Sequence, residues 1–471
     1  MMIMPVRFLF VMLVSASTLF AAPVKTVIKG ELKNGSEKWI RLYEYTNLIS
    51  LKTKKIAVDS IGKNKTFSFE LMIEKGEVKT VFFAVERFKS YDFYVEAGKT
   101  YYLVFDSLDF MLQDEFYSPL TSAFPNLEFA IKDDPNDLNN HIMEMIIEFV
   151  RFSVYDFAEI AQTRNRPKMN EYRIKLDSLF GHITHSFFQT MLEYSFAEME
   201  LAARLKKNSD FVAQYFNDRP FQYDNPAFMN FFNVFFDKYI YTTSRKIPFR
   251  DLDLHIVQER NYKGLLDSLG KDELLVNEVV RDMVLIKNLH QMYFSAFYNR
   301  ESVYNMMQDI STQSKFEKHR QIAADLLTEM NLHKKSMKAP PLIAREIDGQ
   351  IFNLDSLKGM YTYVFFYTTY CRMCYAEMVV LNNLYGKYNN QVHFVSVSMD
   401  VNFLKFYYYM QDYKYPWDFV NFFKNFDIED EWGVKIYPQA FMLDPNGNII
   451  NSNAPMPSEY LDDYFKEILK P

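Results

Sequence analysis

The chain has 471 residues and a formal net charge of −7, and 17% of its residues are aromatic. A mildly acidic chain without a basic block argues against a nucleic-acid partner, and a length of this order indicates roughly three domains. Only two cysteines are present. Domains of this size need no disulfides for stability, so the cysteine pair is free to do chemistry.

Residues 1–22 have the pattern of a secretory signal peptide. One basic residue, Arg7, precedes a short apolar stretch at 8–14, and small residues follow up to Ala21 and Ala22. This order predicts export, with cleavage near Ala21 or Ala22. No later segment has the roughly 20 consecutive apolar residues of a transmembrane helix, so we expect no membrane span in the mature chain.

Short apolar segments separated by turns characterise residues 23–107. Gly62, Gly76 and Gly98 punctuate them, and a further turn is expected at 34–36. Short strands at this spacing predict a small β-sandwich domain. The expected strands cover residues 27–32, 39–43, 66–71, 80–85, 93–95 and 101–105.

Residues 108–333 have the apolar periodicity of helices. Ile142, Ile146 and Ile160 are expected on the apolar face of one helical stretch, and Phe188 and Leu192 on that of another. The pattern predicts a central all-α domain whose aromatic side chains pack its core.

A basic stretch ending in two prolines, residues 334–341, is expected to be a linker. From 342 to 471, strands and helices alternate in the order β-α-β-α-β-β-α, which predicts an α/β domain. Its strands are expected at 361–367, 392–398, 439–443 and 448–451, and its helices at 371–388, 402–413 and 458–469.

The two cysteines stand as Cys371-Arg372-Met373-Cys374 between an expected strand and an expected helix. This is the thioredoxin-like redox arrangement. A helix N-terminus favours the thiolate of Cys371, and Arg372 adds a positive charge. We expect Cys371 to be the exposed, attacking sulfur. Cys374, one turn further, is expected to be more buried and to resolve the mixed disulfide by forming Cys371–Cys374.

Tyr437-Pro438 directly precedes the strand expected at residue 439. A proline that follows a loop at a strand start is a candidate for a cis peptide bond. In thioredoxin folds such a loop faces the dithiol and offers backbone groups to an extended substrate. We therefore expect Tyr437 and Pro438 to contribute to substrate binding.

Residues 339–471 resemble the TlpA/ResA branch of exported bacterial thioredoxin-like thiol-disulfide oxidoreductases. Cys371-x-x-Cys374-x-x-Glu377 is similar to the start of that family's active-site helix, and Tyr437-Pro438 to its cis-proline loop. The resemblance implies disulfide exchange with protein thiols and disulfides, a redox partner protein and a periplasmic location, with no cofactor and no metal. The three-part layout resembles multidomain exported proteins of Bacteroidetes.

Two residues beside the motif bear on the chemistry of the cysteines. Tyr370 stands where the family usually has Trp, and we expect it to contact substrate. Glu377 has two interpretations: an acid-base group for Cys374, or a solvated carboxylate in the first turns that the helix dipole stabilises.

Other interpretations of the cysteine pair lead to different functions. A structural disulfide would make the protein a non-catalytic binding or scaffold protein with a redox-inactive thioredoxin-like domain. A zinc site would need two further ligands from distant histidines. A peroxiredoxin-like site is suggested by Thr368, but Phe365 replaces the expected proline. The dithiol in its strand-to-helix context, together with Tyr437-Pro438, favours a thiol-disulfide oxidoreductase.

Overall fold

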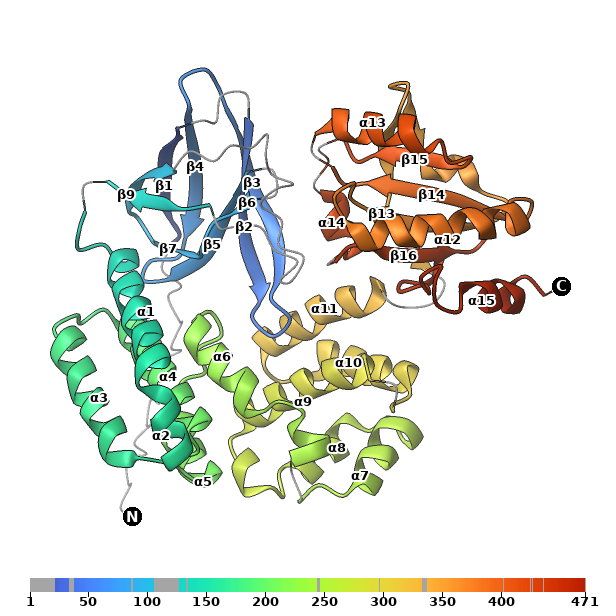
Figure 1. Cartoon of the computed structure of the whole chain (residues 1–471). Helices are drawn as coiled ribbons and strands as arrows, with labels where there is room; N and C mark the ends of the chain where they lie inside the picture. Colours follow the sequence, from blue (N-terminus) through green and yellow to red (C-terminus); the bar gives the residue numbers. More distant parts are fainter. Residues whose placement is uncertain are drawn as a thin grey trace, which may run out of the picture.

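The computed structural model describes residues 22–470, except 34–37, 86–87, 106–126, 133, 244–245, 296, 333–336, 401, 424, 426 and 435. The expected signal peptide up to residue 21, the turn at 34–36 and the start of the expected linker lie outside the described residues. Figure 1 shows a sheet-rich N-terminal region, a helical middle and a C-terminal sheet flanked by helices. At this level the predicted multidomain architecture is confirmed.

The N-terminal region contains two sheets. The first has the strand order β4-β1-β8-β9; the second has the order β3-β2-β5-β6, with β7 also paired to β5. The strands are β1 Val24–Leu32, β2 Lys38–Asn47, β3 Lys52–Ile61, β4 Thr66–Ile73, β5 Val78–Val85, β6 Phe88–Lys89, β7 Phe93–Glu96, β8 Thr100–Phe105 and β9 Phe129–Ile131.

One hydrophobic core joins these two sheets. Ile28 and Phe67 from the first sheet share it with Leu42 and Phe83 from the second. Alternate side chains of a strand point to the same face, so each sheet contributes one apolar face. Gly30 is required within this core, because a Cβ at this position would lie 2.5 Å from the Phe67 ring.

Three strands of this region were not predicted from the sequence: β3, the two-residue β6 and β9. β3 begins Lys-Thr-Lys-Lys and forms an edge of the second sheet by pairing with β2. Lysines are common on edge strands because they discourage pairing with other chains. β9 pairs with β8, so the first sheet includes residues beyond position 107, where we expected the β domain to end.

The middle region consists of helices, several of which begin after an Asn whose side chain accepts a backbone N–H. The helices are α1 Leu138–Tyr155, α2 Phe157–Thr163, α3 Arg166–Phe180, α4 Ser186–Ala202, α5 Asn208–Tyr215, α6 Pro226–Phe235, α7 Phe249–Asp253, α8 Tyr262–Leu269, α9 Glu278–Tyr293, α10 Arg300–Gln313 and α11 Glu317–Leu332. Shorter turns are η2 Tyr239–Thr243, η3 Leu254–Gln258 and η4 Glu273–Leu275. Within the described ranges, no helix has the length and apolar content to cross a bilayer.

The apolar face of α1 differs from the expected one. Ile142, Met145 and Phe152 are buried, whereas Ile146 is 41% exposed. In α4 the expected Phe188 and Leu192 are buried.

The helical core also includes side chains from the N-terminal sheets. Leu48 and Tyr94 belong to the helical core. Asn139 of α1 exchanges two hydrogen bonds with the backbone of Tyr94, and Asp325 of α11 accepts one from the Thr46 hydroxyl at 2.6 Å. The two regions are therefore packed together.

The C-terminal region is built on one mixed sheet of order β10-β17-β16-β13-β14-β15-β11-β12. The strands are β10 Met337–Lys338, β11 Ile343–Glu346, β12 Ile351–Asn353, β13 Tyr361–Tyr367, β14 Val392–Ser398, β15 Asp418–Asn421, β16 Gln439–Leu443 and β17 Asn448–Asn451. The helices are α12 Arg372–Tyr388, α13 Phe403–Tyr413, α14 Asp427–Trp432 and α15 Leu461–Ile468, with the short turn η5 Leu354–Leu357. β10 lies within the stretch expected to be a linker.

Strand β13 lies in the middle of this sheet and is buried on both faces. Tyr363, Phe365 and Tyr367 pack in the core that includes α12, α13 and α15. Val364 and Phe366 pack on the opposite face with α14. A strand covered on both sides is a continuous apolar run. At its end the chain turns into α12, and the two cysteines lie at this turn.

One ion pair connects the C-terminal region to the N-terminal sheets. Lys55 Nζ of β3 lies 2.6 Å from Asp427 Oδ1 of α14. Both side chains are partly exposed, so this contact contributes little to stability. It nevertheless shows that α14 faces β3.

Candidate active site

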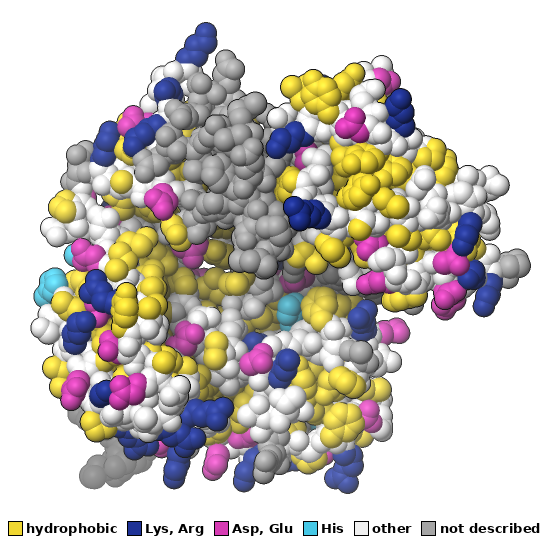
Figure 2. Space-filling model, viewed as in Figure 1, with side chains coloured by type: hydrophobic (Ala, Val, Ile, Leu, Met, Phe, Trp, Pro, Cys, Tyr) yellow, Lys and Arg dark blue, Asp and Glu magenta, His cyan; other side chains and the backbone are white. Residues whose placement is uncertain are grey.

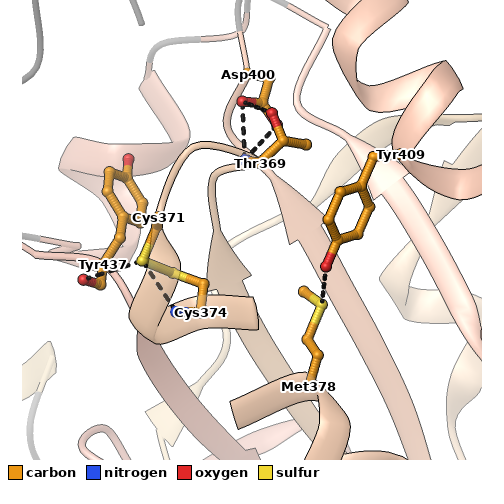
Figure 3. The surroundings of a disulfide bond; sticks show 7 residues. All are labelled: Thr369, Cys371, Cys374, Met378, Asp400, Tyr409 and Tyr437. Carbon is orange, nitrogen blue, oxygen red and sulfur yellow. Dashed lines mark hydrogen bonds between the residues drawn. A yellow bond between two sulfur atoms is a disulfide. The ribbon is translucent and has the colours of Figure 1, made fainter. Parts of the chain in front are cut away.

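Cys371 is the N-cap residue of α12, directly after the loop that follows β13. Its Sγ accepts a hydrogen bond from the backbone N–H of Cys374 at 3.1 Å, and the two sulfurs form a disulfide (Figure 3). An N-cap sulfur receives the unpaired N–H groups of the first turn. When the disulfide is reduced, the same N–H groups and the helix dipole favour a thiolate at Cys371.

The two cysteines differ in accessibility as expected. Cys374 is 1% exposed and belongs to the hydrophobic core beside α12. Cys371 is only partly buried. A substrate can therefore reach Cys371 more easily than Cys374.

Tyr437 lies beside the disulfide, and its peptide bond to Pro438 is cis, which confirms that prediction. The carbonyl oxygen of Tyr437 is 3.8 Å from Cys371 Sγ. A sulfur in a disulfide has no proton, so this is a contact without a hydrogen bond; a Cys371 thiol could donate to this oxygen. The Tyr437 hydroxyl donates to Glu429 of α14, which links the loop to the helix that faces β3.

Glu377 is buried, not solvated, so that interpretation of it is wrong. Its side chain is 5% exposed. The carboxylate accepts hydrogen bonds from the backbone N–H of Ser458 at 2.8 Å and from the Ser458 hydroxyl at 2.5 Å. Glu377 follows Cys374 by three residues, so both lie on one side of α12.

The loop before Cys371 is held by an aspartate that the sequence analysis missed. Asp400 follows β14, is fully buried, and accepts hydrogen bonds from the backbone N–H and the hydroxyl of Thr369 (Figure 3). The Ser398 hydroxyl donates to the same carboxylate at 2.6 Å. Tyr370, between Thr369 and Cys371, is half-buried. An acidic residue two positions after the end of a buried strand was the signal that could have identified Asp400.

Tyrosines near the dithiol are unsuited to acid-base work. The Tyr409 hydroxyl donates to Met378 Sδ at 3.3 Å (Figure 3). Burial raises the pKa of Tyr409 and that of Tyr367, with contributions from Tyr415 and Asp400 respectively. Both phenols therefore stay protonated at ordinary pH.

Exposed apolar side chains surround the cysteine motif. Met373, between the cysteines, is 64% exposed, and Ile436, before Tyr437, is 55% exposed. Figure 2 shows further hydrophobic side chains on the face that carries α12 and α13, where Tyr375 and Tyr408 are exposed. Exposed apolar patches of this kind are typical of sites that contact other proteins.

The described residues contain no group of three or more His, Cys, Asp or Glu side chains arranged to hold a metal ion. What the site offers chemically is a dithiol that can open and close, a neighbouring buried carboxylate, and a carbonyl group directed at the accessible sulfur.

Comparisons with known proteins find relatives of part of this chain. Residues 359–449 match a family model described as thioredoxin-like. The thiol-disulfide oxidoreductase ResA of Bacillus thuringiensis subsp. konkukian is 30% identical over 139 residues, which are 28% of this chain and 76% of the relative. ResA of Halalkalibacterium halodurans is 23% identical over 149 residues, 31% of this chain and 84% of the relative. A solved thiol-disulfide oxidoreductase from Bacteroides fragilis aligns at 19% identity with a TM-score of 0.26, covering 28% of this chain and 99% of its own.

Proposed function

Because this chain belongs to the ResA family of thioredoxin-fold thiol-disulfide oxidoreductases, we propose that it is exported and exchanges disulfides with protein substrates through Cys371 and Cys374. The observation that carries the proposal is the arrangement of the two sulfurs. One is accessible at a helix N-terminus beside the Tyr437 carbonyl, and the other is 1% exposed one turn further along.

In the proposed reaction the Cys371 thiolate attacks one sulfur of a substrate disulfide. A mixed disulfide forms, and the other substrate sulfur leaves as a thiolate. The Cys374 thiolate then attacks Cys371 Sγ, which closes the disulfide seen at this site and releases the second substrate thiolate. The substrate has gained two electrons and the enzyme has lost two. A redox partner protein with a dithiol returns them by the reverse exchange.

Neighbouring residues have supporting roles in this proposal. Tyr437 and Pro438 present backbone groups to an extended substrate beside Cys371, and Tyr370 contacts the substrate next to the attacking sulfur. Glu377 is the acid-base group for Cys374: it accepts the thiol proton when Cys374 becomes a nucleophile. Burial beside a cysteine on the same helix face supports this role.

The location and the domain limits belong to the same proposal. We propose a periplasmic protein whose signal peptide, residues 1–22, is removed near Ala21 or Ala22. The mature chain would comprise a β-sandwich domain that starts at 23 and also includes β9, an all-α domain that ends at 333, and a thioredoxin-like domain from 342 to 471 whose sheet also includes β10 from the expected linker at 334–341. It uses no cofactor.

The test is reduction of insulin disulfides by the full mature chain, with dithiothreitol as electron source. Wild-type protein is expected to accelerate the reaction, and Cys371→Ser is expected to abolish the acceleration. Cys374→Ser is expected to accumulate a mixed disulfide with insulin, because the resolving sulfur is missing. Wild-type activity no higher than that of either variant would favour a redox-inactive scaffold protein instead.

A further inference from the structure

A cavity of about 690 Å³ lies between the second N-terminal sheet and the helical region. Its walls come from β2, the start of β5, the start of α4, the loop at 221–225 and α11, and none of its lining residues belongs to residues 342–471. It is therefore separate from the dithiol site. Figure 1 shows the β2–β3 hairpin reaching α11 at this place.

Strands β2 and β5 stop pairing with each other at the cavity. Their ladder runs from Ile40 opposite Val85 to Glu44 opposite Val81. Beyond it, β2 continues only with β3, and β5 continues with β7. The cavity is lined by the next residues of both strands, Tyr45–Asn47 and Lys79–Thr80, which do not pair with each other. A space between two separating strands fits an extended chain.

Thr80 supplies a hydrogen-bonding group without a partner in this wall. The residue is 8% exposed, and its Oγ1 is buried with no hydrogen bond to any residue that the structure describes. An unsatisfied buried hydroxyl is energetically unfavourable. A ligand group that hydrogen-bonds Thr80 Oγ1 would remove this cost.

Tyr223 supplies a second polar group, which is fixed by a buried chain of hydrogen bonds. The Tyr223 hydroxyl is 2.7 Å from His319 Nε2, and His319 Nδ1 is 2.7 Å from Asp282 Oδ2. Burial opposes ionisation of Asp282, but hydrogen bonds from His319, Ser314 and Tyr262 outweigh it and lower its pKa. The Asp282 carboxylate accepts a hydrogen bond from His319 Nδ1, and His319 Nε2 shares a hydrogen bond with the Tyr223 hydroxyl. Whichever of the two donates in that bond, the Tyr223 oxygen retains a lone pair for a donor in the cavity.

This arrangement is suited to binding rather than catalysis. Burial, with Asp282 and Asp224 nearby, raises the pKa of Tyr223 to about 12. The phenol therefore remains protonated and is neither a general base nor a nucleophile near neutral pH. It acts as an oriented hydrogen-bonding group.

The charges around the cavity balance one another. Lys79 pairs with Glu44 at 2.9 Å and Lys318 with Asp224 at 3.4 Å. Lys54 and Glu77 add one charge of each sign to the lining. The rings of Phe187 and Phe221 supply apolar contact. A ligand of strong net charge gains nothing here, whereas main-chain amides and uncharged side chains find both hydrogen-bonding and apolar surface.

We propose that this cavity binds an extended, uncharged segment of a protein substrate, and so retains the substrate while its disulfide reacts at Cys371. The inference rests on the proposed function for the identity of its ligand. Unlike disulfide exchange at Cys371, binding in the cavity requires no cysteine in the bound segment.

The test uses insulin B chain with carboxamidomethylated cysteines and a fluorescein label, so that the probe cannot react with the dithiol. We expect a saturable rise in anisotropy with the full mature chain, and equal affinity for the Cys371→Ser, Cys374→Ser double variant. Thr80→Val and Tyr223→Phe are each expected to weaken binding about tenfold, the loss of one hydrogen bond. Thr190→Trp, which places an indole in the cavity, is expected to abolish it.

Two matched controls separate loss of the cavity from loss of the fold. Tyr293→Phe removes a buried hydroxyl that donates to the Met330 carbonyl and that does not line the cavity. Thr163, like Thr190, donates to the carbonyl four residues earlier in a helix, and Thr163→Trp lies on an exposed surface. Both are expected to bind like wild type.

Several results would overturn the inference. One is the absence of saturable binding of the peptide. Another is peptide binding that is unchanged in the variants Thr190→Trp, Thr80→Val and Tyr223→Phe. A third is peptide binding that is lost in the double cysteine variant. A maltooligosaccharide probe that binds where the peptide does not would assign the cavity to carbohydrate and equally overturn it. Insulin reduction without peptide binding would refute the cavity inference alone. Peptide binding without insulin reduction would refute the proposed function alone.

Discussion

The carboxylate of Glu377 accepts hydrogen bonds from both the backbone amide and the hydroxyl of Ser458. These two bonds tie the second turn of α12 to the segment before α15. They also keep a carboxylate in the interior, three residues after the buried sulfur of Cys374. A carboxylate held in this way can act as a proton acceptor for Cys374, as a structural clamp, or as both.

Replacing Glu377 by Gln separates these roles. As an acid-base group, Glu377 contributes to the step in which Cys374 resolves the mixed disulfide, so Glu377→Gln should slow insulin reduction by about 10²-fold. The rate of insulin reduction is measured from pH 5 to 9 for the wild type and the variant. Glu467→Gln, on the exposed side of α15, should leave rate and pH profile unchanged. If Glu377→Gln left the rate and its pH profile unchanged and only lowered the melting temperature, Glu377 would have a structural role alone.

Asp400 is expected to be important for stability as well as for activity. Asp400→Ala leaves the Thr369 N–H and the Thr369 and Ser398 hydroxyls without their acceptor in a buried place. The expected loss is about 3 kcal/mol in the free energy of unfolding, measured by urea titration. Because Thr369 lies two residues before Cys371, insulin reduction should slow as well. Asp463→Ala, at an exposed site, is the control, and a loss below about 1 kcal/mol for Asp400→Ala would contradict the prediction.

Asp282 should make stability depend on pH in a defined direction. Its folded-state pKa is lowered, since hydrogen bonds from His319, Ser314 and Tyr262 outweigh the effect of burial. Its stabilising contribution is therefore fully present above the unfolded-state pKa, near 4, and is lost as the pH falls through the lower folded-state value.

The matching experiment compares unfolding of the wild type and Asp282→Asn across pH. At pH 7 the variant should be about 3–5 kcal/mol less stable, because a buried charged partner is removed from its network. The difference should shrink below a pH of about 4. A difference that grows as the pH falls would show that the sign of this contribution is wrong.

The sequence predicted best the parts of the fold that depend on local pattern. β13 was expected at 361–367 and has those bounds, because a continuous apolar run between turns is typical of a strand buried on both faces. The Cys371 position at the start of α12 followed from the motif and its flanks. The cis bond before Pro438 was indicated by a proline at a strand start.

Features that depend on distant residues could not be predicted in the same way. The burial of Glu377 requires Ser458, and the role of Asp400 requires Thr369; both pairs meet only after the sheet has formed. β3 was missed because its lysine-rich start lacks an apolar alternation, and its strand conformation comes from pairing with β2. Exposed Ile146 shows that apolar spacing alone does not identify the buried face of a helix.

Alkylation tests directly whether Cys371 is the accessible, activated sulfur of the pair. The reduced native protein is treated with limiting iodoacetamide at pH values from 4 to 10, and the modified peptides are quantified by mass spectrometry. We expect Cys371 to react first, with a midpoint clearly below the ~8.5 of an ordinary thiol, while buried Cys374 stays unmodified. Preferential modification of Cys374, or a Cys371 midpoint at or above about 8.5, would contradict it.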